Sequence, residues 1–130
     1  MIVPYDINFD PPAPVLSAVL TGVVRSRPQM RLPALIDTGA DVTAIPNTAV
    51  NDLHLYAVAR IEVEGINANI ATVNMYMVRL SVDGQPPCEI EVVPTRQPFV
   101  ILGRDWLESY YLLLNGPEKN FVLSQTRPKE

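Results

Sequence analysis

The part of this sequence best suited to chemistry is the segment from Leu35 to Asp41, in which two apolar residues lead into Asp37, Thr38 and Gly39. Paired carboxylates can activate a water molecule, because one group accepts a proton while the other donates one. The segment occurs once, so one chain supplies only one such carboxylate. We therefore expect the partner acid to come from a second chain.

A second segment, from Phe99 to Leu107, runs a short apolar stretch into Gly103 and then into Arg104 and Asp105. The apolar stretch is typical of a buried strand. An acid at the start of a helix interacts favourably with the helix dipole, so a short helix is expected to begin beside Asp105.

Together the two segments resemble the retropepsin family, the homodimeric aspartic proteases of retroviruses and LTR retrotransposons, which have free-standing bacterial relatives. The match consists of Asp37-Thr38-Gly39-Ala40 and Ile101-Leu102-Gly103-Arg104-Asp105, and the likeness covers roughly residues 14 to 124. It implies a mostly β fold, a closed barrel with a flap hairpin and one short C-terminal helix. It also implies a homodimer that hydrolyses an extended peptide or protein without a cofactor or metal.

The resemblance gives each matching position a role. Asp37 is the catalytic acid, and Thr38, Gly39 and Ala40 complete its loop. Substrate binding is implied for Asp41, Gly65, Ile66, Asn67, Phe99 and Ile101, and support of the loop for Gly103, Arg104 and Asp105. The Thr38 hydroxyl is implied to bond across the dimer and Arg104 to approach Asp41. From the residues alone, Thr38 also fits a surface turn, and Asp41 with Arg104 also fits a solvated ion pair.

Electrostatics explains why two such acids would work as a unit. Two carboxylates about 3 Å apart repel each other by roughly 5 kcal/mol at an effective dielectric constant of 20. A pair of Asp37 side chains would therefore share one proton. The ionised member would act as general base toward water, and the protonated member would polarise the scissile carbonyl.

Length and composition predict one β-rich domain. A chain of 130 residues with 48% hydrophobic content can build a single compact core. Thirteen prolines leave few windows long enough for helices. We expect an extended Pro-rich arm over residues 1–14, the protease-like domain over 15–124 and a frayed tail over 125–130.

Several other kinds of protein are disfavoured. A net charge of −4 offers no basic face for nucleic acid, and the lone Cys88 excludes an internal disulfide framework. The lone His54 provides no metal-binding set. Neither a signal-peptide pattern nor a run of eighteen apolar residues is seen, so no membrane partner and a cytoplasmic location are expected.

The elements that must position Asp37 are mostly strands. We expect strands at 15–24, 30–36, 60–64, 72–82, 88–93 and 99–102, a final hairpin of 111–114 with 121–123, and short helices at 46–55 and from Trp106 toward Tyr110. The hairpin around residues 64–70 occupies the position of the family's flap. Gly65 is its only glycine, where retroviral flaps are glycine-rich. Asn67 and Asn69 can both adopt left-handed turn geometry, so a flap remains feasible.

Other interpretations stay open. An isolated Asp-Thr-Gly also fits a β-turn in which Asp37 bonds its own backbone. The runner-up function is a low-activity or inactive module that keeps the fold and binds peptides. A purely structural dimerisation domain is a third possibility, although it gives no reason for an acid at position 37.

Overall fold

The computed structural model describes residues 1–24 and 27–127, and for Ile66 it describes the backbone alone. The expected tail at 125–130 therefore lies partly outside the described residues. Within them, strands dominate and the helices are short, as the many prolines predicted. No described helix has both the length and the apolar character needed to cross a membrane.

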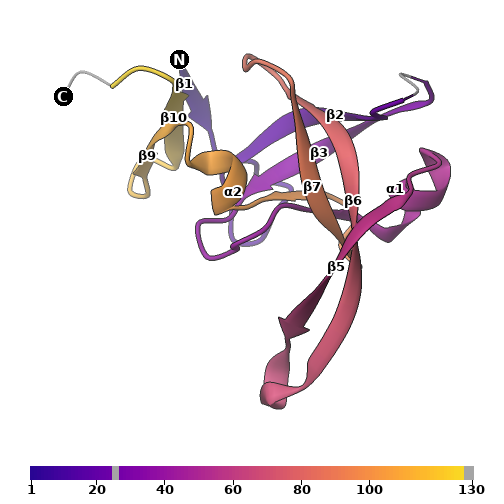
Figure 1. Cartoon of the computed structure of the whole chain (residues 1–130). Helices are drawn as coiled ribbons and strands as arrows, with labels where there is room; N and C mark the ends of the chain where they lie inside the picture. Colours follow the sequence, from indigo (N-terminus) through magenta and orange to yellow (C-terminus); the bar gives the residue numbers. More distant parts are fainter. Residues whose placement is uncertain (25–26, 128–130) are drawn as a thin grey trace.

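In the described part of the chain, six strands close into a barrel (Figure 1). They are β2 (Val15–Gly22), β3 (Gln29–Ile36), β8 (Val100–Leu102), β4 (Ala44–Pro46), β7 (Cys88–Thr95) and β6 (Ile70–Val82), in spatial order. Pairing of β2 with β6 closes the circle. β3 runs parallel to β8, and β4 runs parallel to β7.

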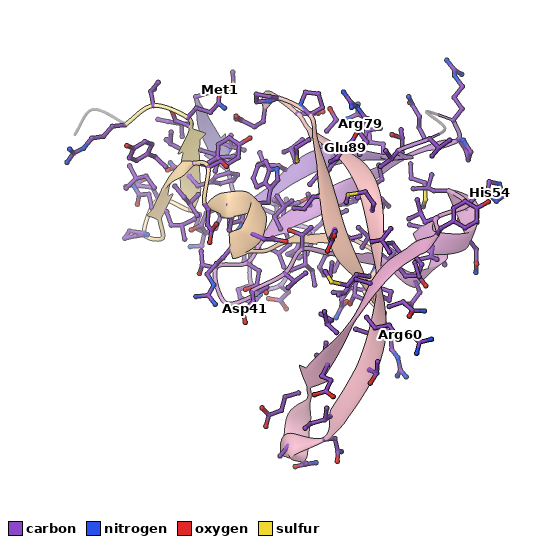
Figure 2. All side chains as sticks on the ribbon, in the orientation of Figure 1. Met1, Asp41, His54, Arg60, Arg79 and Glu89 are labelled. Carbon is purple, nitrogen blue, oxygen red and sulfur yellow. The ribbon has the colours of Figure 1, made fainter. Side chains whose placement is uncertain are left out.

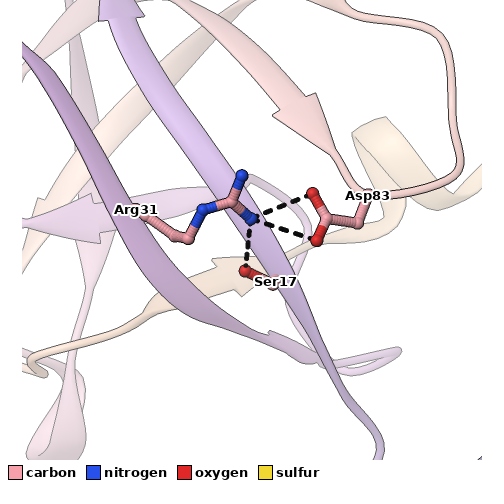
Figure 3. A network of polar contacts seen from close by, with 3 residues as sticks. All are labelled: Ser17, Arg31 and Asp83. Atoms are coloured by element: carbon pink, nitrogen blue, oxygen red, sulfur yellow. Dashed lines mark hydrogen bonds and ion pairs between the residues drawn. The ribbon is translucent and has the colours of Figure 1, made fainter.

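The barrel is filled by alternating apolar side chains of its strands. Its fully buried members include Leu20, Ile45, Val78, Leu80, Val92, Val100 and Leu102. Polar contacts link the same strands on the outside. Arg31 of β3 donates to Ser17 of β2 at 2.9 Å and to Asp83, just after β6, at 3.0 and 3.1 Å (Figure 3). This network spans the seam at which the barrel closes.

Two short helices lie where the sequence predicted them. α1 (Asn47–Asp52) follows Pro46, whose fixed φ suits the start of a helix. α2 (Arg104–Leu107) carries Asp105 in its first turn. This helix is shorter than expected, because Tyr110 already lies in a following turn that closes on the Leu107 carbonyl at 3.0 Å.

A separate small sheet brings the two ends of the chain together (Figure 1). Its order is β1 (Ile2–Pro4), β10 (Asn120–Ser124) and β9 (Tyr111–Asn115), all antiparallel. The expected final hairpin is therefore present. Phe121 of β10 is completely buried and belongs to the same core as the barrel residues.

The expected flap hairpin is also present. β5 (Ala57–Glu64) pairs with β6 as far as Glu64 opposite Ile70, and the 3₁₀ turn η1 (Ile66–Ala68) forms the tip. Figure 1 shows this hairpin projecting away from the barrel. Asn67 is left-handed, with φ 68°, as predicted, but the second left-handed residue is Ala68, with φ 60°. Asn69 is extended, with φ −70°, so it does not use the left-handed geometry that its residue type allows.

Candidate active site

Asp37 lies at the end of β3, in the loop that leads to β4. Its backbone N–H donates to the Leu102 carbonyl at 3.0 Å, which extends the pairing of β3 with β8 by one residue. Its carboxylate accepts a hydrogen bond from the Gly39 N–H at 2.9 Å. This bond fixes the orientation of the acid, although a simple Asp turn would make the same contact.

Backbone hydrogen bonds fasten the loop of residues 37–43 to the start of α2; we call it the catalytic loop because it carries the candidate acid Asp37. The Arg104 N–H donates to the Ala40 carbonyl at 2.8 Å, and the Asp105 N–H donates to the Asp41 carbonyl at 3.3 Å. Gly103 permits this approach, because a Cβ there would lie 2.7 Å from the Val42 carbonyl carbon. The structure thus brings the two sequence segments into direct contact.

Asp105 adds a side-chain connection between the same segments. Its two oxygens accept the Thr43 N–H at 3.1 Å each, and Oδ1 also accepts the Thr43 hydroxyl at 2.7 Å. The Gly103 N–H in turn donates to the Thr43 Oγ1 at 3.1 Å. Thr43 is fully buried, and sequence reasoning missed it. Its only sequence signal is a threonine close after the Asp37-Thr38-Gly39 segment, which is too common a pattern to single it out.

Arg104 and Asp41 form an ion pair on the outside of the loop. Both side chains are more than half exposed, so the pair contributes about 1 kcal/mol or less to stability. Asp41 lies at the outer edge of the loop, and Arg60 lies on the flap hairpin (Figure 2). Thr38 is exposed beside Asp37.

The remaining predicted residues fall into two groups. Phe99 and Ile101 are half-buried, while Val100 and Leu102 between them are fully buried. By strand alternation, Phe99 and Ile101 share the outer face of the barrel with Leu35 and, one residue beyond the strand end, Asp37. We call this half-buried surface the outer apolar face.

The second group lies at the tip of the flap. Gly65 and Asn67 are exposed there, and the side chain of Ile66 lies outside the described residues. Because the tip projects from the barrel, the single chain does not bring these residues onto Asp37 (Figure 1).

The single thiol of the chain, Cys88, is not activated as a nucleophile. Burial raises the pKa of Cys88 above its ordinary value of 9.0, although a hydrogen bond with Trp106 acts in the opposite direction. Burial also raises the pKa of Tyr110. Within residues 1–24 and 27–127, no three His, Cys, Asp or Glu side chains are grouped to hold a metal ion.

Comparison with known proteins agrees with this geometry. The profile of the family described as retroviral aspartyl protease matches residues 12–115. The chain belongs to the retroviral aspartyl protease family. No curated protein sequence matches closely enough to count as a relative.

Solved structures of this family's kind share the fold. A retropepsin-like aspartic protease from Rickettsia conorii matches with a TM-score of 0.61 at 14% identity, over 95% of this chain and 88% of that chain. The simian foamy virus protease matches with a TM-score of 0.55 at 20% identity, over 72% of this chain and 91% of that chain. The foamy viral protease–reverse transcriptase bound to an RNA/DNA hybrid matches with a TM-score of 0.56 at 19% identity. The match covers 76% of this chain but 12% of that chain. The predicted retropepsin-like β fold is confirmed, and family and fold together support aspartic protease activity in general.

Proposed function

We propose that this protein is an aspartic endopeptidase that acts as a homodimer, with Asp37 of each chain forming the acid–base pair. The observation that carries the proposal is the catalytic loop itself. Its carboxylate is held by the Gly39 N–H, its backbone is fastened to Arg104 and Asp105, and the Gly103 N–H bonds to the buried Thr43 hydroxyl. A simple surface turn needs no such buried connection to a segment far along the chain.

The mechanism follows from the chemistry of two close carboxylates. They share one proton, because repulsion of roughly 5 kcal/mol at 3 Å opposes ionising both. The ionised Asp37 takes a proton from water, whose oxygen attacks the peptide carbonyl carbon. The protonated Asp37 hydrogen-bonds to the carbonyl oxygen and protonates it as the tetrahedral intermediate forms. Proton transfer to the amide nitrogen then lets the C–N bond break and frees the two products.

Apolar surface beside Asp37 and on the flap hairpin supports an extended peptide with apolar side chains as the substrate. The outer apolar face offers Leu35, Phe99 and Ile101 on the barrel side. On the flap, strand register places Ile61 opposite Val73 and Val63 opposite Ala71 on one face, while Arg60, Glu62 and Glu64 share the other. Val63 is 40% exposed in the single chain. Closure of the flap would cover the apolar side chains of a bound peptide.

The small terminal sheet supports a second copy of the chain as partner. In the described chain β9 is an edge strand, paired with β10 alone. Its Tyr111, Leu113 and Leu114 are 48%, 54% and 44% exposed, and the strand has no charge or proline to block pairing. A stable interface buries about 800 Å² per partner. Antiparallel pairing of two β9 strands would add to that area.

The second candidate is a peptide-binding module with the same fold and little activity. It is favoured by the flap tip, where Ala68 takes a left-handed geometry better suited to glycine and Gly65 is extended. Such a tip is poorly suited to closing over a substrate.

The test is cleavage of a diverse peptide library by the wild type, Asp37→Asn and the control Asp52→Asn. Asp52 is an exposed acid on α1, outside the site. Asp37→Asn should abolish cleavage while keeping the fold, because an amide cannot accept the proton. Asp52→Asn should remain active, and specific activity should rise with protein concentration. Cleavage by Asp37→Asn at the wild-type rate would refute the mechanism, and peptide binding without cleavage would favour the second candidate.

A further inference from the structure

The N-terminal arm folds into a closed loop that fixes the position of one aromatic side chain. The Asp6 N–H donates to the Ala13 carbonyl at 2.7 Å, and the Ala13 N–H returns a bond to the Asp6 carbonyl at 3.3 Å. Inside the loop, the Asn8 N–H donates to the Asp6 carboxylate at 2.8 Å. Ile7 is 85% exposed, whereas Phe9 is half-buried. The loop therefore presents Phe9 to the body of the protein.

The side chain that Phe9 meets belongs to the outer apolar face. The Phe9 and Phe99 rings lie edge to face, with centroids 5.0 Å apart and an interplanar angle of 70°. This is a favourable geometry for an aromatic pair. Phe99 shares its face with Ile101 and, through strand register, with Leu35. Phe9 thus extends the apolar surface that leads to the catalytic acid.

The exit of the loop is also tied to the catalytic strand. The Ile36 N–H donates to the Pro14 carbonyl at 3.0 Å, directly before Asp37. The loop is consequently fixed at its tip through Phe99 and at its exit beside the acid. A wall with two such anchors can restrict the size of a neighbouring pocket, since neither end is free to move aside.

We infer that the loop of residues 6–13 forms one wall of the peptide-binding groove, and that Phe9 with Phe99 determines which size of substrate side chain is accepted beside them. This inference rests on the proposed peptidase function and adds a specificity-determining residue to it. This wall contacts an apolar side chain of the bound peptide, close to the peptide bond that is cut. A larger substrate side chain fits into this part of the groove only if the Phe9 ring moves away.

A merely structural Phe9 would behave differently from a specificity residue. Loss of packing lowers stability, and with it activity toward every substrate by a similar factor. Loss of a pocket wall changes the ratio of activities between substrates of different size. Tyr5 provides the matched control, because it is an aromatic residue of the same arm whose ring packs on Phe121 of β10, with centroids 6.2 Å apart.

The experiment compares kcat/KM of the wild type, Phe9→Ala, Phe9→Leu and Tyr5→Ala. The probes are quenched fluorescent octapeptides that carry Ala, Val, Leu or Phe at each of the four positions around the scissile bond. Phe9→Ala should change the ratio for large against small side chains at one position by about tenfold, in favour of large ones. Phe9→Leu should shift the same ratio less, and Tyr5→Ala should leave all ratios unchanged.

The outcomes distinguish failure of the inference about Phe9 from failure of the proposed peptidase function. Unchanged ratios in Phe9→Ala and Phe9→Leu, with the wild type active, would overturn the inference and leave the peptidase proposal intact. An equal shift in Tyr5→Ala would also overturn it, because the effect would then be general to the arm. If Phe9→Ala does not fold, the ratios of Phe9→Leu decide. A wild type that cleaves none of the peptides while it binds them would refute the peptidase proposal, and the inference with it.

Discussion

Replacing Gly103 by alanine should damage the catalytic loop through direct contact with backbone. The added Cβ would lie 2.7 Å from the Val42 carbonyl carbon, 2.9 Å from the Val42 oxygen and 3.0 Å from the Ala40 oxygen. All three contacts are with backbone atoms, so no side chain can rotate away. Gly103 itself has φ −87°, which alanine adopts readily, so the contacts alone oppose the substitution.

The size of the effect can be worked from these contacts. Overpacking of a close contact costs about 1–3 kcal/mol, and alanine regains roughly 0.5 kcal/mol by restricting the unfolded chain. We therefore expect the free energy of unfolding to fall by about 1.5 kcal/mol, and Tm by about 6 °C. Ala40 is three residues from Asp37, so relief of the clash displaces the acid. A displacement of this kind should reduce kcat at least tenfold.

Two other glycines serve as controls for the steric effect at Gly103. A Cβ on Gly116 would meet no atom within 4 Å, and Gly116→Ala should change stability by less than about 0.5 kcal/mol. Gly84 is equally open but has φ 83°, so Gly84→Ala should cost about 1 kcal/mol through backbone strain without loss of activity. Urea unfolding and peptide cleavage measure both quantities. Equal stability and activity of Gly103→Ala and Gly116→Ala would refute the reasoning.

Three further changes probe other parts of the molecule. Leu113→Lys should weaken dimerisation and activity together, measured by sedimentation and cleavage, because it places a charge on the β9 edge; an unaltered dimer would rule out this strand as the interface. Thr43→Val should lower the free energy of unfolding by about 1–3 kcal/mol, because the buried Gly103 N–H loses its acceptor, and urea unfolding that matches the wild type would contradict this. The raised pKa of Cys88 lets the folded state keep the thiol proton above pH 9.0, where the unfolded chain ionises. Cys88 should therefore leave the free energy of unfolding unchanged at lower pH and reduce it as pH rises beyond about 9. Urea midpoints from pH 7 to 10.5 should decline less steeply in Cys88→Ala, and identical slopes would argue against the assignment.

The sequence allowed the general fold and the neighbourhood of Asp37 to be predicted, because both depend on short-range patterns. An apolar strand followed by an acid and a glycine is local information, and so is the second strand before Gly103. Their direct contact was implied only by family resemblance. The structure supplies its physical basis, the missing side chain of Gly103 against the backbone of Val42.

Features that depend on distant partners could not be predicted. Thr43 becomes important only because Asp105 lies beside it, and the two are 62 positions apart. The arm looked like an extended proline-rich segment, whereas its first strand pairs with β10 and its middle folds into the loop that carries Phe9. At the flap tip, the residue types of positions 67 and 69 suggested that Asn67 and Asn69 are left-handed. The β5–β6 pairing ends at Glu64 and Ile70, and the second left-handed residue of the turn is Ala68 instead.

The two parts of the proposed peptide-binding site, the catalytic loop and the flap hairpin, are held in the fold with very different strength. The catalytic loop is attached by backbone bonds to Ala40 and Asp41 and by the buried Thr43 contact, so it cannot move without disturbing α2. In the flap strand β5, every residue except Ala59 and Ile61 is exposed, and its support is the hydrogen-bond ladder to β6. Segments with few buried contacts open at lower free energy than the core. Peptide entry should therefore be governed by the hairpin, while the geometry of the acid stays constant. In the proposed peptidase, the energy of closing the flap would come from its apolar face covering the side chains of the substrate.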